Sequence, residues 1–367
     1  MKIVHFTSVH RLSDTRIFVK QCCSLERQGI ETILIGCGDF DSVESGVKIK
    51  VIPKRKGFLK RLFLTDFAIT TKALAENADI YHFHDPELIP FAIFMRLLGK
   101  KVVFDAHEDL SLQISNKIWL PKFLRKPLAY FARFLYWSAD KTMSGIVTVT
   151  PTLIKQFRNK NTVLVRNFPD LGEFTKIKED DINERENNAV YVGGVTKVRG
   201  LKENILAINN ISPTLNAKLL VGGTFQSKDF EDEINALNLK NTDFKGWLSR
   251  DKVQSLLSQA KIGLVTLHPT ANYYDAYPVK MFEYMAAGLP VIASDFPVYR
   301  EIIETADCGI LVDPLKPEKI SEAIERLLCT PDVIIKYAKN GRKAAMEYYN
   351  WQHEAEQLIS LYQKILL

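Results

Sequence analysis

Residues 275–297 have the sequence DAYPVKMFEYMAAGLPVIASDFP, in which a short helical segment leads directly into an apolar run. Pro278 suits the first position of a helix, and Gly288 followed by Pro290 marks its end, so we predict a helix of about ten residues from Pro278 to Ala287. The run PVIASD that follows is typical of a strand buried in a parallel sheet. This stretch therefore predicts an α/β protein.

Glu283 is an acid within this apolar helix. At about 100° per residue it falls at the edge of the apolar arc that contains Val279 and Phe282, so it does not point plainly at water. The amides of the first helical turn attract anions, and an anionic ligand would explain why Lys280 opposes the helix dipole there. A surface Glu283 that pairs with Lys280 three residues earlier is the alternative, and the helix alone does not separate the two.

The chain as a whole has the composition of a soluble globular protein. Its 367 residues predict two domains, with 46% hydrophobic and 25% charged residues. The five cysteines are odd in number, lack the spacing of metal ligands and follow no secretory signal, so we expect reduced thiols that pack in a cytoplasmic protein. No apolar run reaches the roughly 18 to 20 residues that span a bilayer.

Short apolar runs alternate with helical patterns along the sequence. In the first half the runs are KIVHFTSV, ETILIGCG, VKIKVIP, ADIYHFH, KVVFDAH, GIVTVT and TVLVRNF. The pattern resumes with AVYVGG, AKLLVGG, TDFKGW, KIGLVTL, PVIASD and GILVD. Strands that alternate with helices predict two Rossmann-like domains, which we expect to face each other across a central cleft. The polar, acidic segment FTKIKEDDINERENN (174–188) between the two series is interpreted as a linker.

Positive charge is concentrated in the first half, where residues 1–168 carry 26 Lys and Arg against 15 Asp and Glu, whereas the remainder carries 23 against 28. Much of the excess lies in PKRKGFLKRLFLTDF from Pro53 and in KIWLPKFLRKPLAYFARFLYW from Lys117. Basic residues interleaved with aromatic ones are typical of helices on an anionic membrane surface, and equally of core helices with solvated lysine tips. The sequence shows no nucleic-acid-binding motif, so we expect no nucleic-acid partner.

Two other chemistries are disfavoured. The first strand leads into TSVHRLSDTR, without the Gly-x-Gly-x-x-Gly turn that receives a dinucleotide in dehydrogenases. Asp39-Phe40-Asp41 has the Asp-x-Asp pattern of some metal-dependent transferases, but we interpret it as a solvated turn after the second strand. We therefore expect no cofactor and no catalytic metal.

Taken together, the motifs resemble family 4 glycosyltransferases, which are retaining enzymes with the two-domain GT-B fold. In the second half the resemblance is carried by VYVGGVTKVRGL, LLVGGTFQ, FKGWLSRDKV, YPVKMFEYMAAGLPVIASDFPVYREII, CGILVDP and YYNWQHEAEQLISLY. In the first half, TSVHRLSDTRIFVKQCCSLERQGIETILIG, YHFHDPELIP and KVVFDAHEDLS are similar to a bacterial, cell-surface polysaccharide branch. The resemblance implies an acceptor-side domain at 1–168, a nucleotide-sugar-binding domain at 169–349, and a last helix of about 350–367 that packs back on the first domain.

The resemblance assigns roles to residues in the opening stretch. Glu283 would hold the ribose hydroxyls of a nucleotide sugar, because one carboxylate accepts from two adjacent hydroxyls. Asp275 would contact the donor sugar, although it is one methylene shorter than the family's usual Glu. Pro278 replaces a family glycine, and we expect Tyr277, Pro278 and Val279 to border the donor.

The leaving diphosphate needs positive charge nearby. Arg199 matches one of two basic residues that family members place after the first strand of the second domain, whereas Gly194 stands where the other, an Arg, is usual. Lys280 is expected to supply the missing charge. The resemblance also places Trp247 beside the base, with a core position for Trp247 as the alternative.

In the first domain, His107 matches a family histidine that contacts the donor sugar near the reacting carbon. Arg16 lies in the loop after the first strand, where relatives hold the diphosphate with a Gly-rich turn, and its charge is expected to serve instead. His84 and Asp85 either face the acceptor or are hydrogen-bonded at a strand end.

The sequence therefore predicts a retaining glycosyltransferase that moves a sugar from a nucleoside-diphosphate donor, with UDP favoured, to a cell-surface glycan acceptor. The acceptor is expected to be lipid-linked or an oligosaccharide, and the protein to be cytoplasmic and peripheral on the inner face of the plasma membrane. Two alternatives remain, a nucleotide-sugar epimerase of similar fold and a non-catalytic nucleotide-sugar-binding partner of an assembly complex.

Overall fold

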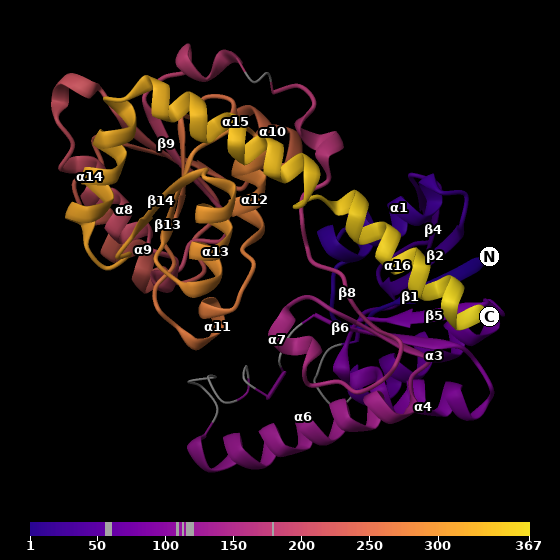
Figure 1. Ribbon diagram of the computed structural model, residues 1–367. Helices are drawn as coiled ribbons and strands as arrows, with labels where there is room; N and C mark the ends of the chain where they lie inside the picture. The colour runs from indigo at the N-terminus through magenta and orange to yellow at the C-terminus, as the bar shows by residue number, and fades with distance from the viewer. Residues whose placement is uncertain (56–60, 108–109, 112–113, 115–120, 178–179) are drawn as a thin grey trace. The chain divides into compact units, whose positions relative to one another are not determined.

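The structure is a computed structural model that describes residues 1–55, 61–107, 110–111, 114, 121–177 and 180–367. The chain forms two compact units (Figure 1): unit 1 comprises Met1–Asn167 and Gln352–Leu367, and unit 2 comprises Phe168–Trp351. Unit 1 thus contains both ends of the chain. Each unit has its own sheet with helices on both faces, as the sequence predicts.

Unit 1 contains an eight-stranded sheet in the order β3-β4-β2-β1-β5-β6-β7-β8. The strands are β1 (Lys2–Phe6), β2 (Glu31–Cys37), β3 (Ser42–Glu44), β4 (Val47–Ile52), β5 (Ile80–Phe83), β6 (Val102–Ala106), β7 (Gly145–Thr148) and β8 (Thr162–Leu164). All pair in parallel except β3, which is antiparallel to β4. The prediction misses β3, because its three residues are too few to carry an apolar pattern.

Two different sets of helices cover the two faces of this sheet. On one face α3 (Asp66–Ala75), α4 (Ile89–Leu97) and α6 (Lys122–Thr142) pack on apolar side chains such as Phe83 and Phe104. The other face carries η1 (Thr15–Cys22), α1 (Cys23–Arg27) and α16 (Trp351–Leu366). Shorter segments are η2 (Arg61–Thr65), η3 (Pro86–Leu88) and α7 (Pro151–Ile154).

Unit 2 contains a parallel six-stranded sheet in the order β11-β10-β9-β12-β13-β14. The strands are β9 (Asn188–Val192), β10 (Lys218–Gly222), β11 (Thr242–Gly246), β12 (Ile262–Val265), β13 (Val291–Ser294) and β14 (Gly309–Val312). The order reverses at β9, which lies between β10 and β12. Open α/β sheets bind ligands outside the carboxyl ends of the strands at such a reversal.

The helices of unit 2 surround this sheet. They are α8 (Leu201–Asn209), α9 (Lys228–Asn235), α10 (Arg250–Leu257), α11 (Ala271–Tyr274), α12 (Val279–Ala286), α13 (Pro297–Ala306), α14 (Pro317–Leu328) and α15 (Pro331–Glu347). Short 3₁₀ turns are η4 (Leu171–Phe174), η5 (Asp180–Asn183), η6 (Lys197–Arg199) and η7 (Pro213–Leu215).

Helix α12 is fixed closely to the centre of the unit 2 sheet. It begins after Pro278 and ends before Gly288, whose φ is +66°, within one residue of the predicted bounds. Gly263 in β12 permits the close approach, because a Cβ there would lie 2.3 Å from the ring of Tyr284. The Tyr284 oxygen accepts a hydrogen bond of 2.9 Å from the amide of Val192 at the end of β9. The helix is therefore hydrogen-bonded to the carboxyl end of β9, the strand at which the order reverses.

The interpretation of residues 174–188 as a linker is wrong. Phe174, Ile177 and Ile182 are buried in the core of unit 2, and the Arg185 guanidinium donates to the carbonyl of Ala260. The acidic residues between them suggest solvent exposure, but apolar residues spaced by three to five anchor the segment on the sheet domain. The boundary between the units lies earlier, between Asn167 and Phe168.

No described helix has the length and apolar character needed to cross a membrane. Of the two basic, aromatic stretches in the sequence, residues 56–60 and 115–120 lie outside the described residues.

Candidate functional site

Glu283 is buried at the carboxyl edge of the unit 2 sheet, with 6% of its surface exposed. Its Oε1 atom accepts a hydrogen bond of 2.7 Å from Nη2 of Arg250, at the start of α10. Arg250 also pairs with Glu173 in η4, through an Nε contact of 2.9 Å. The alternative of a surface pair between Glu283 and Lys280 is therefore wrong. Glu283 is instead oriented by Arg250, which has Glu173 as a second carboxylate partner.

Lys280 lies in the first turn of α12 beside Glu283. Its Nζ atom is buried and has no hydrogen-bond partner among the described residues, although part of the side chain reaches solvent. The ammonium lies 3.7 Å from the centroid of the Tyr191 ring, a cation–π contact. Burial and the nearby charge of Arg199 lower the pKa of Lys280 well below its ordinary value, and Glu283 opposes them. A lysine in this environment is stabilised by any anion that reaches it.

Arg199 and Gly194 complete this group of residues. The Arg199 guanidinium donates to the carbonyl of Gly194 at 3.2 Å and to the hydroxyl of Tyr273 at 3.4 Å. The hydroxyl of Tyr191 donates to the same carbonyl at 2.8 Å. A Cβ at position 194 would lie 2.7 Å from the amide nitrogen at the end of the exposed Gln226 side chain, which can move aside. Arg199 is therefore an oriented cation rather than a freely solvated one.

The remaining predicted residues of unit 2 lie around this group with different exposure. Pro278 caps α12, Val279 begins it, and the ring of Tyr277 stacks on Phe282 at 6.2 Å between centroids. Asp275 is exposed at the end of α11. Trp247 is 75% exposed in the loop after β11, so the alternative of a core tryptophan is wrong. The structure thus assembles Glu283, Lys280, Arg199 and Gly194 and leaves Asp275 and Trp247 on the surface.

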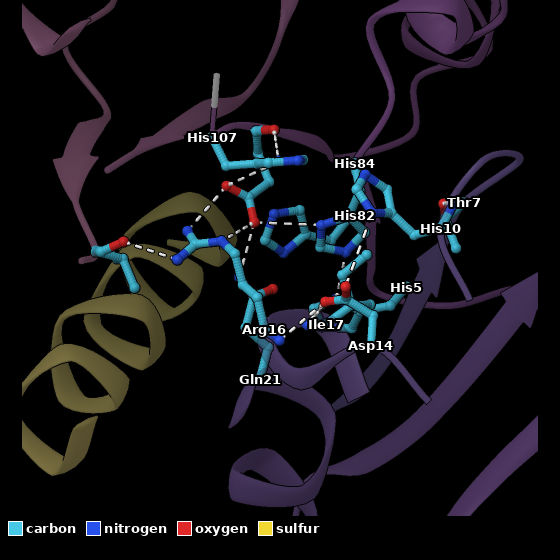
Figure 2. Close-up of polar contacts among 12 residues, drawn as sticks. His5, Thr7, His10, Asp14, Arg16, Ile17, Gln21, His82, His84 and His107 are labelled. Atoms are coloured by element: carbon cyan, nitrogen blue, oxygen red, sulfur yellow. Dashed lines mark hydrogen bonds and ion pairs between the residues drawn. The ribbon is translucent and has the colours of Figure 1, made fainter. Parts of the chain in front are cut away.

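In unit 1, His107 follows β6 at the carboxyl edge of the sheet (Figure 2). Its Nδ1 atom lies 3.2 Å from the carbonyl oxygen of Asp105, the acceptor for an Nδ1–H donor. That hydrogen bond selects the tautomer whose Nε2 atom is an acceptor. The imidazole of His10 packs edge-on against His107 with 5.0 Å between ring centroids, and 15% of the His107 side chain is exposed. His107 is therefore oriented and partly open to a ligand.

Arg16 has a structural position that differs from the predicted one. Its guanidinium forms a bidentate pair with Asp105, at 3.0 and 2.9 Å, and its third contact is the carbonyl of Val165. Arg16 is 6% exposed. The arginine that sequence reasoning assigned to a diphosphate is thus already bound to a buried carboxylate, and we do not include it in the donor site proposed below.

His84 and Asp85 are also hydrogen-bonded and buried rather than presented to a ligand. Asp85 accepts from the Thr7 hydroxyl at 2.8 Å and from the Ser8 amide at 2.6 Å, which fixes the loop after β1. His84 has no exposed surface, and its Nδ1 atom lies 3.2 Å from Asp105.

A chain of buried hydrogen bonds starts at Asp105. Burial alone would raise the pKa of Asp105, but the charge of Arg16 and the hydrogen bond of His84 outweigh it and hold the pKa well below its usual range. The carboxylate can only accept, so His84 donates from Nδ1, and its Nε2 accepts from Nδ1 of His5 at 3.1 Å. His5 Nε2 then accepts from the hydroxyl of Tyr362, at 3.4 Å, and Tyr362 accepts from Nδ1 of His82, at 2.6 Å.

This chain determines the tautomer of each buried imidazole and leaves His82 Nε2 as an acceptor without a partner among the described residues. Two sets of side chains place possible metal-binding atoms within 4.8 Å of one another, His5–His82–His84 and His84–Asp105–His107. In both sets most of these atoms already form the hydrogen bonds described above. The arrangement is that of a polar network that attaches α16 to the sheet.

Sequence reasoning missed Arg250, Glu173, Tyr191 and the histidine network. A signal for the network was present, because His82 and His84 alternate with apolar residues and therefore share one face of β5, and His5 pairs with His82 in register. Arg250 carried no such signal, because its contact with Glu283 joins two helices that are far apart in sequence.

Comparisons with known proteins agree with this fold. Residues 173–344 match the family model described as glycosyl transferases group 1, and residues 16–168 match glycosyltransferase family 4. An uncharacterized glycosyltransferase of Methanocaldococcus jannaschii is 27% identical over 183 residues, and the lipopolysaccharide glucosyltransferase WaaG of Escherichia coli is 26% identical over 189. These matches cover 49% and 50% of this chain, and the chain spans about half the length of these relatives, 46% and 49%.

Solved structures match over almost the full chain. Anabaena HepE in complex with UDP-glucose superimposes with a TM-score of 0.75 at 14% identity, covering 99% of this chain and 100% of HepE. WaaG superimposes with a TM-score of 0.69 at 16% identity, covering 99% of this chain and 98% of WaaG. Two Rossmann-like units of this kind define the GT-B class of glycosyltransferases. The chain belongs to family 4 of that class.

The histidine network makes the stability of the protein depend on pH. Burial lowers the pKa of His5 and His82 well below their ordinary value, and it lowers the pKa of His84 to about 3. The unfolded chain therefore binds protons below about pH 6.5 that the folded chain does not, and the free energy of unfolding falls as pH falls through that window. Each such histidine contributes a slope of up to about 1.4 kcal/mol per pH unit.

We expect His82→Gln to reduce this slope by about one histidine's share between about pH 6 and pH 4, because one fewer group takes up a proton on unfolding. Urea unfolding at a series of pH values measures it, with His353→Gln, an exposed histidine on α16, as the control. An unchanged slope in His82→Gln would show that His82 titrates alike in the folded and unfolded states.

Proposed function

We propose that the protein is a retaining glycosyltransferase that moves a sugar from a nucleoside-diphosphate donor, with UDP favoured, to a cell-surface glycan acceptor. One observation carries the proposal. Lys280 Nζ is buried without a hydrogen-bond partner among the described residues, next to Arg199 and Glu283, at the strand edge where α/β sheets bind ligands. HepE was crystallised with UDP-glucose, and WaaG is involved in lipopolysaccharide biosynthesis, so these two structural relatives support this class of donor and acceptor.

The proposed donor site uses the chemistry of each residue in turn. Glu283 accepts hydrogen bonds from the two ribose hydroxyls through its two oxygens, while Arg250 keeps it oriented. Lys280 and Arg199 meet the diphosphate, and their charge stabilises the negative charge that develops on the leaving group. Because two side-chain cations supply this charge, the proposed mechanism uses no metal and no cofactor.

His107 is proposed to act at the donor sugar. Its Nε2 atom is an acceptor that can take a hydrogen bond from a sugar hydroxyl, since its Nδ1 atom is engaged with the Asp105 carbonyl. Among the residues that the structure describes, Asp85 and Asp105 beside it are buried and hydrogen-bonded, so we place neither of these two carboxylates as a nucleophile. We therefore favour attack from the face that the diphosphate leaves, with a phosphate oxygen taking the acceptor proton.

We further propose that unit 1 docks on an anionic membrane, so that the acceptor is lipid-linked and the protein is peripheral on the cytoplasmic face. Helix α6 exposes aromatic side chains at spacings of seven, four and three residues, which place them on one face. They are Phe123, Tyr130, Phe134 and Trp137, with exposed fractions of 77%, 67%, 57% and 57%. Arg125, Lys126 and Arg133 on the same helix add positive charge, as in helices that lie in a membrane interface.

The donor assignment is tested with Glu283→Gln and the exposed Glu304→Gln as a matched control. We expect UDP and UDP-sugars to raise the melting temperature of the wild type by mass action, and Glu283→Gln to bind roughly five- to tenfold more weakly, because charged hydrogen bonds become neutral ones. Arg250 keeps Glu173 as a partner, so the variant should remain folded. Wild-type affinity in folded Glu283→Gln would refute the ribose assignment.

For His107→Ala we expect turnover to fall at least about a hundredfold while affinity for free UDP stays near the wild-type value, as for a group that acts at the sugar. Steady-state kinetics together with calorimetry separate the two quantities. His10→Phe, which keeps an aromatic ring against His107, should lose much less activity. A parallel collapse of nucleotide affinity and rate would contradict the assignment.

For membrane docking we expect Phe134→Ser/Trp137→Ser to weaken binding to phosphatidylglycerol vesicles about tenfold or more, because interfacial burial of two aromatic rings is lost. Phe40→Ser, which alters an aromatic residue 76% exposed elsewhere on unit 1, is the control. Co-sedimentation at about 0.1 M and 1 M salt should also show weaker binding at high salt, because the Debye length shortens from about 10 to 3 Å. Equal binding by both variants would remove α6 from the membrane face.

A further inference from the structure

A polar recess lies in unit 1, at the edge of the sheet opposite His107. Its volume is about 510 Å³, in the range of a small-ligand site, and its lining includes Lys101, Ser144 and Asn161. These residues directly precede β6, β7 and β8, so the recess lies at the amino ends of these strands. A strand of five residues spans roughly 16 Å, which separates the recess from the carboxyl edge.

The charged side chains in the described lining are all positive. Arg96 on α4, Lys101, Lys160 and Lys364 on α16 line the recess, and no acidic residue joins them among the residues that the structure describes. Within the same part of the chain, the ammonium groups of Lys101 and Lys160 have no ion-pair or hydrogen-bond partner. Four cations from four separate segments have thus been brought to one concave surface, which raises the affinity of the recess for an anion.

Two of the cations are held in place by backbone carbonyls. Arg96 donates from Nε to the carbonyl of Thr142 at 2.8 Å and from Nη1 to that of Lys100 at 2.5 Å. Lys364 donates to the carbonyl of Lys160 at 3.3 Å. Their other N–H groups and the ammonium groups of Lys101 and Lys160 remain for a ligand. A tetrahedral phosphate, with several strong acceptor oxygens, matches such a set of donors.

The surroundings of the recess indicate where such a phosphate comes from. Arg96 is followed in the chain by Leu97, the last residue of α4, and by Leu98, which are 80% and 52% exposed. Helix α4 packs against α6, which carries the exposed aromatic residues described above. Leu97 and Leu98 adjoin Arg96 and precede Lys101 in the chain, so exposed apolar residues lie close in sequence to two residues that line the recess. A phosphate site with such neighbours suits a lipid, whose headgroup is anionic and whose chains begin beside it.

We propose that this recess binds the phosphate of an anionic lipid headgroup. The ligand is distinct from both substrates of the transfer reaction, because the recess and His107 lie at opposite edges of one sheet. It would fix the orientation of unit 1 on the membrane, whereas the aromatic face of α6 supplies burial. The proposal rests on the membrane docking proposed above for unit 1 and not on the transfer reaction, so it stands whether or not the chain transfers a sugar.

The test compares full-length wild type, Lys101→Gln/Lys160→Gln, and the control Lys155→Gln/Lys252→Gln, which removes the same charge from exposed lysines outside the recess. Co-sedimentation with phosphatidylglycerol vesicles should show binding roughly 25-fold weaker for the recess variant, since each lysine near an anionic surface contributes about a factor of five. The control should change binding by less than about threefold. Circular dichroism confirms that each variant is folded.

Calorimetry with glycerol 1-phosphate separates the possible sources of the phosphate. Loss of vesicle binding in the recess variant, with weak or no binding of the soluble headgroup, supports the proposal. Equal vesicle binding by the recess and control variants overturns it. Tight binding of glycerol 1-phosphate that depends on Lys101 and Lys160, with vesicle binding unchanged, overturns the lipid source and assigns the recess to a soluble phosphate.

Discussion

The buried carboxylate of Asp105 is the interaction on which the organisation of unit 1 depends. One side chain receives Arg16 and Gln21 from η1 and His84 from the end of β5, and its backbone carbonyl orients His107. An ionised group without exposed surface is costly unless it is fully hydrogen-bonded, so the three donors are a requirement of the fold and not an addition to it. The same requirement sets the direction of every hydrogen bond from His84 to His82.

In unit 2 the charged residues around Glu283 are not all hydrogen-bonded. Glu283 accepts from Arg250, and Arg199 donates to the carbonyl of Gly194, whereas Lys280 contacts the face of the Tyr191 ring. The difference between the units is therefore chemical as well as topological. Unit 1 satisfies the buried charges of Asp105 and Arg16 internally, whereas the buried Lys280 Nζ atom of unit 2 has no acceptor among the described residues, and this contrast is why we propose the donor site in unit 2.

The fold class follows from sequence with little ambiguity, because thirteen apolar runs alternate with helical patterns and all thirteen correspond to strands. Features that depend on neighbours in sequence could also be predicted. Pro278 and Gly288 predict the two ends of α12 to within one residue. Contacts between distant segments were not. Arg16 was expected at a ligand, but nothing in its own sequence surroundings shows that the strand containing Asp105 lies beside it. The segment 174–188 was wrongly interpreted as a linker for a related reason. Its charged residues can be read from the sequence, but the burial of its three apolar residues depends on the surface of unit 2 that they cover, which the sequence does not show.

Helix α16 closes unit 1 from the far end of the chain. Leu358, Leu361 and Tyr362 are buried there, and Tyr362 joins His5 to His82. During synthesis the first 167 residues leave the ribosome long before this helix, and the whole of unit 2 is made in between. Until Tyr362 emerges, the two hydrogen bonds that join His5 to His82 through its hydroxyl cannot form, so unit 2 is able to fold first and unit 1 is completed last.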